Sequence, residues 1–226
     1  MALKIYGTAA SRAARPLWVA QELGLAYEHI ALPYLNGATR TPEFLALNPN
    51  GHIPVVDDDG VLVWESMACA LYLAERFKHD GRPSLAAANF AEQAEILRWS
   101  FWVVNECEKE ALAFLMHGVL MPLERRKPEL AQVAQRRLQG PLRVLEQHLQ
   151  ARPYLAGERF TVADVCVASV LAWVETADEL MAPCPRVRDW LKRCLARPAF
   201  QAVQRLAASS PERTAPSSVA GYGPAM

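Results

Sequence analysis

Residues 48–66 of this 226-residue chain read NPNGHIPVVDDDGVLVWES and carry its strongest structural signal. Two short runs rich in β-branched residues, 55–56 and 61–64, lie on either side of Asp59-Gly60. An Asp-Gly pair between apolar runs is typical of a β-hairpin. A Glu-Ser pair then precedes an amphipathic stretch, 67–77. The segment therefore predicts a strand, a tight turn, a second strand and a helix.

Two places in this segment suit a small peptide that carries a carboxylate. Pro54 opens the first strand, where it cannot donate a main-chain hydrogen bond, and it holds Ile53 extended. The main chain of Ile53 can then pair with an extended ligand as an added strand would. Ser66 stands where the helix begins, and the N–H groups there attract anions. The alternative is that Pro54 is an ordinary edge-strand proline and Ser66 only caps the helix.

The pattern N-P-x-G-x-I-P, a hairpin and then Glu-Ser before a helix resembles the glutathione site of the cytosolic glutathione S-transferase superfamily. The likeness covers the whole chain except its last stretch and points to a serine-type class, bacterial-like or phi- or theta-like. It implies that the Ile53–Pro54 bond is cis and that Ile53 pairs through its main chain with the cysteinyl part of glutathione. It also implies that Glu65 and Ser66 bind the γ-glutamyl amino and carboxylate groups.

The order of elements along the chain agrees with that family. The first part reads as strand, helix, strand, short helix, strand, strand, helix, with the first helix at 12–23 and the short one near Thr41-Pro42. Pattern and resemblance together predict a two-domain α+β protein: an N-terminal thioredoxin-like βαβαββα domain followed by an all-α helical-bundle domain. The expected bounds are 1–78 for the first domain, 79–88 for a linker, 89–208 for the helical domain and 209–226 for an irregular tail.

Helical signals fill the second domain. Helices are expected at 90–120, 129–150, 165–174, 185–194 and 198–206. Gly140-Pro141 should bend the second of them. Thr161, followed three residues later by Asp164, resembles a capping box before an apolar run, and so predicts the start of a buried helix.

The composition excludes several classes of function. Lysine plus arginine equals aspartate plus glutamate, 24 each, so there is no global electrostatic case for nucleic acid or an anionic membrane. Five irregularly spaced cysteines without a C-x-x-C pair argue against disulfides and against a zinc site, and no metal is expected. Cys69 and Cys166 are predicted to be buried thiols. The sequence shows no signal peptide and no membrane-spanning stretch, which favours a cytoplasmic protein.

In this family the residue that activates the thiol lies near the end of the first strand, where the candidates are Tyr6, Thr8 and Ser11. Tyr6 lies within the predicted strand, and its side chain is expected to serve packing, which leaves two candidate donors. No cysteine precedes Cys69, which disfavours the cysteine-bearing branches of the family. Ser11 resembles the catalytic serine, which would donate a hydrogen bond to the sulfur of glutathione. Such a bond favours the thiolate, which is the nucleophile. Ser11 could instead only cap a helix, and Thr8 is the second candidate donor.

The resemblance assigns further contacts to glutathione and to a second substrate. His52 matches a polar position that contacts glutathione, and Arg40 lies where a basic residue meets the glycyl carboxylate. The second-substrate pocket, which would hold an apolar electrophile, is expected to involve Ala10, Tyr34, Trp102 and Asn105.

These signals together predict a glutathione transferase active in detoxification. It would use glutathione as co-substrate to attack a small apolar electrophile, and it would form a homodimer. One alternative is a zeta-like glutathione-dependent isomerase, but its Ser-Ser-Cys-Ser signature is absent from residues 8–11. The other is a non-catalytic binding or assembly protein, which the presence of Ser11 and Glu65-Ser66 disfavours. The physiological electrophile depends on pocket shape rather than on a motif.

Overall fold

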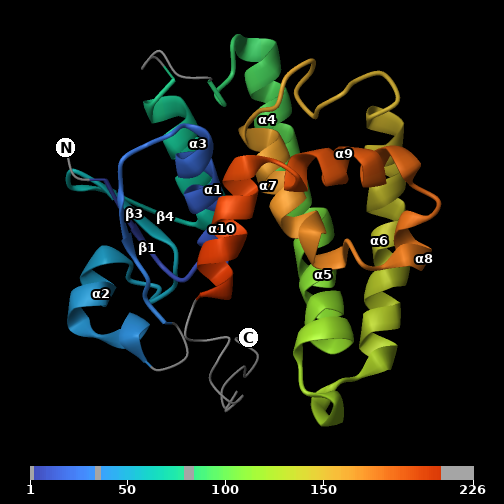
Figure 1. Ribbon diagram of the computed structural model, residues 1–226, viewed down its shortest axis with the longest axis horizontal. Helices are drawn as coiled ribbons and strands as arrows, with labels where there is room; N and C mark the ends of the chain where they lie inside the picture. Colours follow the sequence, from blue (N-terminus) through green and yellow to red (C-terminus); the bar gives the residue numbers. More distant parts are fainter. Residues whose placement is uncertain (1–2, 34–36, 79–83, 210–226) are drawn as a thin grey trace. The chain divides into compact units, whose positions relative to one another are not determined.

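A computed structural model describes residues 3–33, 37–78 and 84–209 (Figure 1). The chain divides into two compact units. One comprises Met1–Arg76 together with the chain from Ala199 onward, and the other comprises Phe77–Pro198. Half of the expected linker, 79–83, and all of the expected tail except residue 209 lie outside the described residues.

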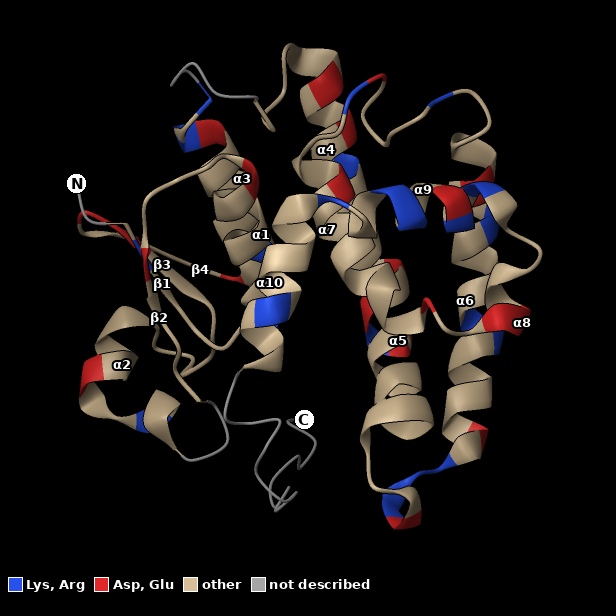
Figure 2. Ribbon diagram, in the orientation of Figure 1, with Lys and Arg blue, Asp and Glu red and all other residues tan. Residues whose placement is uncertain are grey.

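The first unit is built on a four-stranded mixed sheet. Its strands are β1 (Leu3–Tyr6), β2 (Glu28–Ile30), β3 (Val55–Asp58) and β4 (Val61–Trp64), in the order β2-β1-β3-β4. β1 runs parallel to β2 and antiparallel to β3, with Ile5 opposite Val56. β3 and β4 form the predicted hairpin, and the N–H of Gly60 donates to a carboxylate oxygen of Asp57 at 2.8 Å. The turn between them is acidic (Figure 2).

Helices cover both faces of this sheet. α1 (Ala14–Glu22) and α3 (Ser66–Arg76) lie on one side, and the short α2 (Pro42–Leu47) lies on the other (Figure 1). Thr41 caps α2, because its hydroxyl accepts a hydrogen bond from the N–H of Phe44 at 3.3 Å. A 3-10 turn, η1 (Ala38–Arg40), precedes it. The element order is the thioredoxin-like βαβαββα order that the sequence predicts.

Two details of the first unit differ from the sequence-based expectation. α1 begins at Ala14 rather than Arg12, because residues 9–13 form turns in which the N–H of Ala13 bonds to the side chain of Ser11. α10 (Pro198–Ala208) groups with the first unit, although the expected bounds place it in the helical domain. Phe200 of α10 packs against Trp18 of α1, with ring centroids 4.6 Å apart.

The second unit is helical, as predicted. Its α-helices are α4 (Phe90–Trp102), α5 (Lys109–Phe114), α6 (Pro128–His148), α7 (Val162–Leu171), α8 (Asp178–Met181) and α9 (Pro185–Leu195). Short 3-10 turns occur at η4 (Leu123–Arg125) and η5 (Ala172–Val174). Two π-helical segments, η2 (Val103–Glu108) and η3 (Leu115–Leu120), interrupt the single helix expected over 90–120. α6 continues through Pro141.

α7 forms the core of this unit, and it carries almost no charge (Figure 2). The predicted capping box is present: the carboxylate of Asp164 accepts from the N–H of Thr161 at 2.9 Å. The same carboxylate accepts from the N–H of Leu155 at 3.0 Å and from the indole N–H of Trp190 at 2.9 Å. The helix begins at Val162, three residues earlier than expected, because Asp164 stands at its third position.

Candidate active site

Gly7 brings two parts of the candidate site into close contact. It follows β1 with φ +126°, a conformation that side chains rarely adopt. A Cβ built at this position would lie 2.9 Å from the Cβ of Ala13 and 3.0 Å from the Cβ of Ile53. The absence of a side chain therefore allows the Ser11 loop and the Ile53–Pro54 segment to pack against the same point of the chain.

This close approach gives a stability prediction. Gly7→Ala should lower the free energy of unfolding by about 2 kcal/mol, because the added methyl group is both strained and crowded. Gly24→Ala is the matched control: φ there is +59°, and nothing lies within 4 Å of the added Cβ. Gly24→Ala should lower the free energy of unfolding by only about 1 kcal/mol, because only the backbone conformation is strained. Urea unfolding of both variants measures the difference, and equal losses would contradict the close-packing argument.

Ser11 lies in the turn before α1. Its hydroxyl donates to the carbonyl of Thr8 at 2.7 Å and accepts from the N–H of Ala13 at 3.1 Å. Ala13 is the residue at the N-cap position of α1, and it makes no side-chain capping bond. Ser11 is partly exposed, whereas Thr8 is only 3% exposed. The hydroxyl of Ser11 is therefore the more accessible of the two candidate donors.

The Ile53–Pro54 peptide bond is cis, as the resemblance implies. Within the part of the chain that the structure describes, no hydrogen bond involves the main chain of Ile53. Asn48, which the sequence reasoning missed, holds the loop that precedes the cis bond. The side-chain amide of Asn48 donates to the carbonyl of His52 at 2.7 Å. Asn48 is 2% exposed and also accepts from the N–H of Asn50 at 3.0 Å.

The start of α3 combines a strained residue with a buried cation. Glu65 has φ +70°, which is costly for a residue with a side chain and is a feature that clusters at functional sites. Ser66 follows it as the first residue of α3, and its hydroxyl accepts from a guanidinium N–H of Arg15 at 2.7 Å. Arg15 is 1% exposed. Its positive charge therefore adds to the potential of the α3 N-terminus.

Sequence reasoning missed Arg15 as well. The available signal was an arginine within the otherwise apolar run Ala13 to Leu17, since arginine is rarely buried without a partner. The residue that it contacts, Ser66, lies in a different helix, and no local pattern connects the two.

Arg40 lies over the turn that leads to His52. One guanidinium nitrogen donates to the carbonyl of Asn50 at 3.2 Å. Gly51 has φ +62°, and a Cβ there would come within 2.7 Å of the same guanidinium. His52 itself is exposed. The hydrogen bond to Asn50 thus holds Arg40, which lies in η1 before α2, against the loop after α2 that carries His52.

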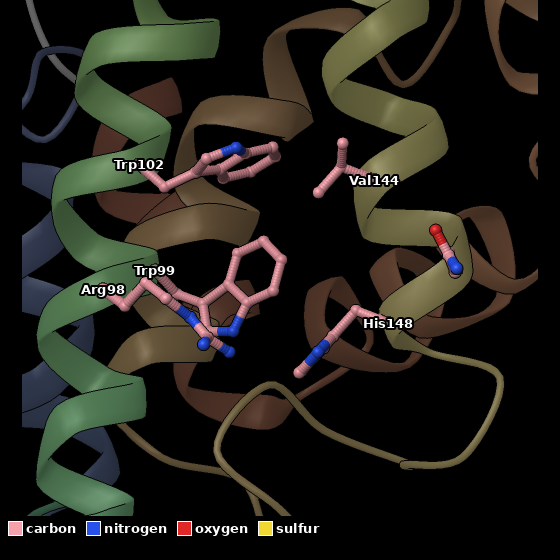
Figure 3. Close-up of a pocket in the computed structure, with 6 residues that line it drawn as sticks. Arg98, Trp99, Trp102, Val144 and His148 are labelled. Carbon is pink, nitrogen blue, oxygen red and sulfur yellow. The ribbon is translucent and has the colours of Figure 1, made fainter.

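The residues expected at the second-substrate pocket are spread over the chain. Ala10 is exposed in the first unit. Asn105 is exposed in the π-helical segment η2 and donates to the carbonyl of Phe101 at 2.9 Å. Trp102 lines a cavity between α4 and α6 (Figure 3). Tyr34 lies outside the described residues.

None of the five cysteines suits thiol chemistry. All five are buried, as predicted for Cys69 and Cys166, and none forms a disulfide. Burial raises the pKa of Cys69 to about 12 and that of Cys107 to about 12, so both thiols stay protonated at neutral pH. Among the described residues, no group of three or more His, Cys, Asp or Glu side chains could hold a metal ion.

Comparison with known proteins shows the family to which the chain belongs. The sequence profile of the glutathione S-transferase N-terminal domain matches residues 1–75, and that of the C-terminal domain matches residues 111–193. Glutathione S-transferase 3 of Zea mays is 33% identical over 205 residues, which cover 88% of this chain and 91% of that protein. The chain belongs to the glutathione S-transferase family.

Another glutathione S-transferase and an elongation factor subunit resemble the chain at a similar sequence identity. A theta-class glutathione S-transferase from Xanthomonas axonopodis pv. citri, solved with glutathione bound, superimposes with a TM-score of 0.77 at 29% identity, over 88% of this chain and 95% of that one. Elongation factor 1-gamma of Equus caballus is 31% identical over 206 residues, which cover 85% of this chain and 44% of that protein. Among the residues that the structure describes, no helix is long and apolar enough to cross a membrane.

Proposed function

We propose that this protein is an active glutathione transferase that joins the thiolate of glutathione to an apolar electrophile. The observation that carries the proposal is the pairing of Arg15 with Ser66 in the same unit as Ser11 and Ile53, whose main chain makes no hydrogen bond among the described residues. A cationic helix N-terminus, an open peptide edge and a hydroxyl donor are the three groups that an extended thiol tripeptide requires. The theta-class relative solved with glutathione bound supports the proposal.

In this proposal the tripeptide lies extended along the loop before β3. The main chain of its cysteinyl residue pairs with Ile53, as an added strand pairs with a sheet edge. Its γ-glutamyl carboxylate binds at Ser66 and the first N–H groups of α3, where Arg15 adds positive charge, and Glu65 takes the amino group. Its glycyl carboxylate meets Arg40, with His52 beside it.

The hydroxyl of Ser11 would then change its hydrogen-bond partner. In the free protein it donates to the neutral carbonyl of Thr8. A thiolate is a stronger acceptor than a carbonyl because hydrogen bonds to ionised groups are about twice as strong as neutral ones. The hydroxyl proton therefore turns toward the sulfur, while the N–H of Ala13 still donates to the oxygen and polarises the O–H bond.

This exchange lowers the pKa of the bound thiol, because the hydrogen bond stabilises only the charged form. The thiol proton passes to solvent, and the thiolate attacks the electrophile. It either adds to it, and the anionic adduct then takes up a proton from water, or it displaces a leaving group that departs with the bonding electrons. We place the electrophile next to Ala10, in the same unit as Ser11.

Two measurements test the proposal. Isothermal titration calorimetry with glutathione tests binding, and turnover of a chlorinated dinitrobenzene tests chemistry. Saturable binding together with turnover above the spontaneous reaction is the expected result. Absence of both would contradict the proposal.

One specific observation favours a second candidate, a binding or assembly module without activity: the similarity to elongation factor 1-gamma. This candidate predicts no turnover, and it gives no reason for Ser11 substitutions to matter. Turnover that depends on Ser11 would exclude it.

An apolar stripe on α4 and η2 supports the proposed homodimer. Phe90, Leu97, Phe101 and Val104 are 90%, 41%, 63% and 40% exposed. Their spacing of seven, four and three residues places them on one face of the helix. A second copy of the chain, with the same stripe, would cover this face in a self-complementary contact.

Phe101→Glu should therefore weaken the dimer about tenfold or more, because it places a charge in an apolar contact. Leu123→Glu is the matched control: Leu123 is 78% exposed but lies in η4, off the stripe. Sedimentation equilibrium over a range of concentrations measures both variants. A parent protein that is monomeric, or equal effects of the two substitutions, would contradict this interface.

A further inference from the structure

Two consecutive residues of β2 hold the chain at the point where β1 ends. β2 is an edge strand of three residues that lies beside β1 (Figure 2). The carbonyl of Ile30 accepts from the N–H of Gly7 at 2.9 Å. The imidazole Nε2 of His29 lies 2.8 Å from the carbonyl oxygen of Gly7. Both main-chain polar groups of Gly7 are therefore bound to β2, one by a main-chain atom and the other by a side chain.

His29 is the donor in the second of these hydrogen bonds. A carbonyl oxygen only accepts, so Nε2 carries the proton, as it does both in this neutral tautomer and in the imidazolium. Among the described residues, the ring is the single hydrogen-bond donor to the Gly7 carbonyl. A regular parallel ladder would supply a main-chain N–H from beyond Ile30. β2 ends at Ile30, so the side chain of His29 takes the place of that donor.

Gly7 connects this hydrogen bond to Ser11. Thr8 follows Gly7 directly, and its carbonyl accepts from the N–H of Ser11 at 3.1 Å and from the hydroxyl of Ser11 at 2.7 Å. The Gly7 carbonyl belongs to the peptide group that leads into Thr8. A rotation of that peptide group would therefore move the Thr8 carbonyl and the Ser11 hydroxyl with it.

The same glycine borders the segment that would bind the cysteinyl main chain. A Cβ built at Gly7 would lie 3.0 Å from the Cβ of Ile53, so the two residues are in close contact. Glycine is the residue with the greatest conformational freedom, and no side chain of its own fixes Gly7 at φ +126°. The hydrogen bond from His29 restrains this residue, and with it the separation between the Ser11 hydroxyl and the Ile53 main chain.

We propose that His29 is a positioning residue of the candidate active site, whose hydrogen bond to Gly7 holds the Ser11 hydroxyl at the sulfur of a glutathione paired with Ile53. The inference rests on the proposed function, because the sulfur would lie between the two groups that Gly7 separates. His29 touches neither substrate and acts only through the main chain. Such a role matters because a displacement of about 1 Å at a reacting group can slow a reaction about 100-fold.

Two substitutions of His29 test the proposal. His29→Leu removes the donor, whereas His29→Gln carries an amide N–H at about the position of Nε2. His29→Leu should lower kcat/KM for a chlorinated dinitrobenzene about threefold or more near neutral pH and raise the pKa of the bound thiol by about 0.5. Kd for glutathione should stay within about twofold of the parent value, because its carboxylates bind elsewhere. His29→Gln should restore most of kcat/KM and of the thiol pKa.

A loss of stability alone would not give this result. If His29→Leu does not fold, His29→Asn takes its place, because its shorter side chain does not reach the Gly7 carbonyl. The same rise in thiol pKa is expected of it. A folded donor-free variant with the parent's kcat/KM and thiol pKa would overturn the proposal, and so would equal losses in His29→Leu and His29→Gln.

His148→Leu is the matched control (Figure 3). The Nε2 of His148 also lies 2.8 Å from a main-chain carbonyl oxygen, that of Leu155, but in the helical unit. Both histidines are partly buried. His148→Leu should lower the urea midpoint about as much as His29→Leu and leave the pKa of the bound thiol at the parent value. An equal rise of the thiol pKa in both variants would overturn the proposal.

The parent protein separates this inference from the proposed function. If the parent binds glutathione and turns over the electrophile while folded His29→Leu matches it in both measurements, only the role of His29 is overturned. If the parent shows neither binding nor turnover, the proposed function is contradicted, and this inference with it.

Discussion

Ser11→Ala should lower kcat/KM for a chlorinated dinitrobenzene about 10- to 100-fold near neutral pH. The variant removes the hydroxyl that would donate to the sulfur of bound glutathione. A hydrogen bond to a charged acceptor contributes about 1.5–3 kcal/mol, which is about one to two units of thiol pKa. Binding of glutathione should change little, because its carboxylates and main chain contact other residues.

The pH dependence identifies the cause of this loss. A free thiol has a pKa of about 8.5, and the hydrogen bond holds the pKa of the bound thiol below that value. Without the bond the pKa rises, so Ser11→Ala is slowest relative to the parent at low pH. The deficit should shrink as the pH passes about 8.5 and both forms become thiolate. Ultraviolet absorbance of the bound thiolate, followed with pH, measures the shift directly.

Thr8→Val is the control for Ser11→Ala. It keeps the shape of the side chain and the Thr8 carbonyl that accepts from Ser11, but it removes the hydroxyl of the second candidate donor. The variant should keep its thiol pKa. If the pKa of the bound thiol rose in Thr8→Val and stayed unchanged in Ser11→Ala, Thr8 rather than Ser11 would be the donor.

Arg15→Met should weaken glutathione binding about 10- to 100-fold, because it removes a buried positive charge from the α3 N-terminus. The hydroxyl of Ser66 would also lose its 2.7 Å hydrogen-bond donor. Since the charge acts on the γ-glutamyl carboxylate and not on the sulfur, the change should appear in Kd and KM. kcat at saturating glutathione and the pKa of the bound thiol should stay near the parent values.

A double-mutant cycle combines Arg15→Met with Ser66→Ala. The two groups share one hydrogen bond, so their effects on Kd should be less than additive. Methionine is an apolar side chain of similar length, which suits a buried position and should preserve folding. Unfolding curves check this point. An unchanged Kd in a folded Arg15→Met variant would contradict the role of Arg15.

Local signals in the sequence predicted much of the fold. The Asp-Gly pair predicted the β3–β4 hairpin, Thr41-Pro42 predicted the start of α2, and Thr161 with Asp164 predicted the capped, buried helix α7. Each of these depends on residues a few positions apart, where backbone geometry leaves few alternatives. The N-P-x-G-x-I-P pattern, with the Glu-Ser that follows, predicted the family through resemblance.

Contacts between distant residues were not predictable in this way. Arg15 meets Ser66 across two helices, and Phe200 meets Trp18 across most of the chain, so α10 joins the first unit. The π-helical segments of the long helix were also missed, because the apolar spacing over 90–120 fits an uninterrupted α-helix equally well. The positive charge of the candidate site comes from the contact between Arg15 and Ser66. Because these residues are far apart in the sequence, only the structure shows that charge.

A crystal structure of the protein soaked with glutathione tests the central claim most directly. We expect the cysteinyl main chain to pair with Ile53, the sulfur to lie within hydrogen-bond distance of the Ser11 hydroxyl, and the γ-glutamyl carboxylate to meet Ser66. Glutathione bound elsewhere, or no bound glutathione at a concentration far above the calorimetric Kd, would contradict it.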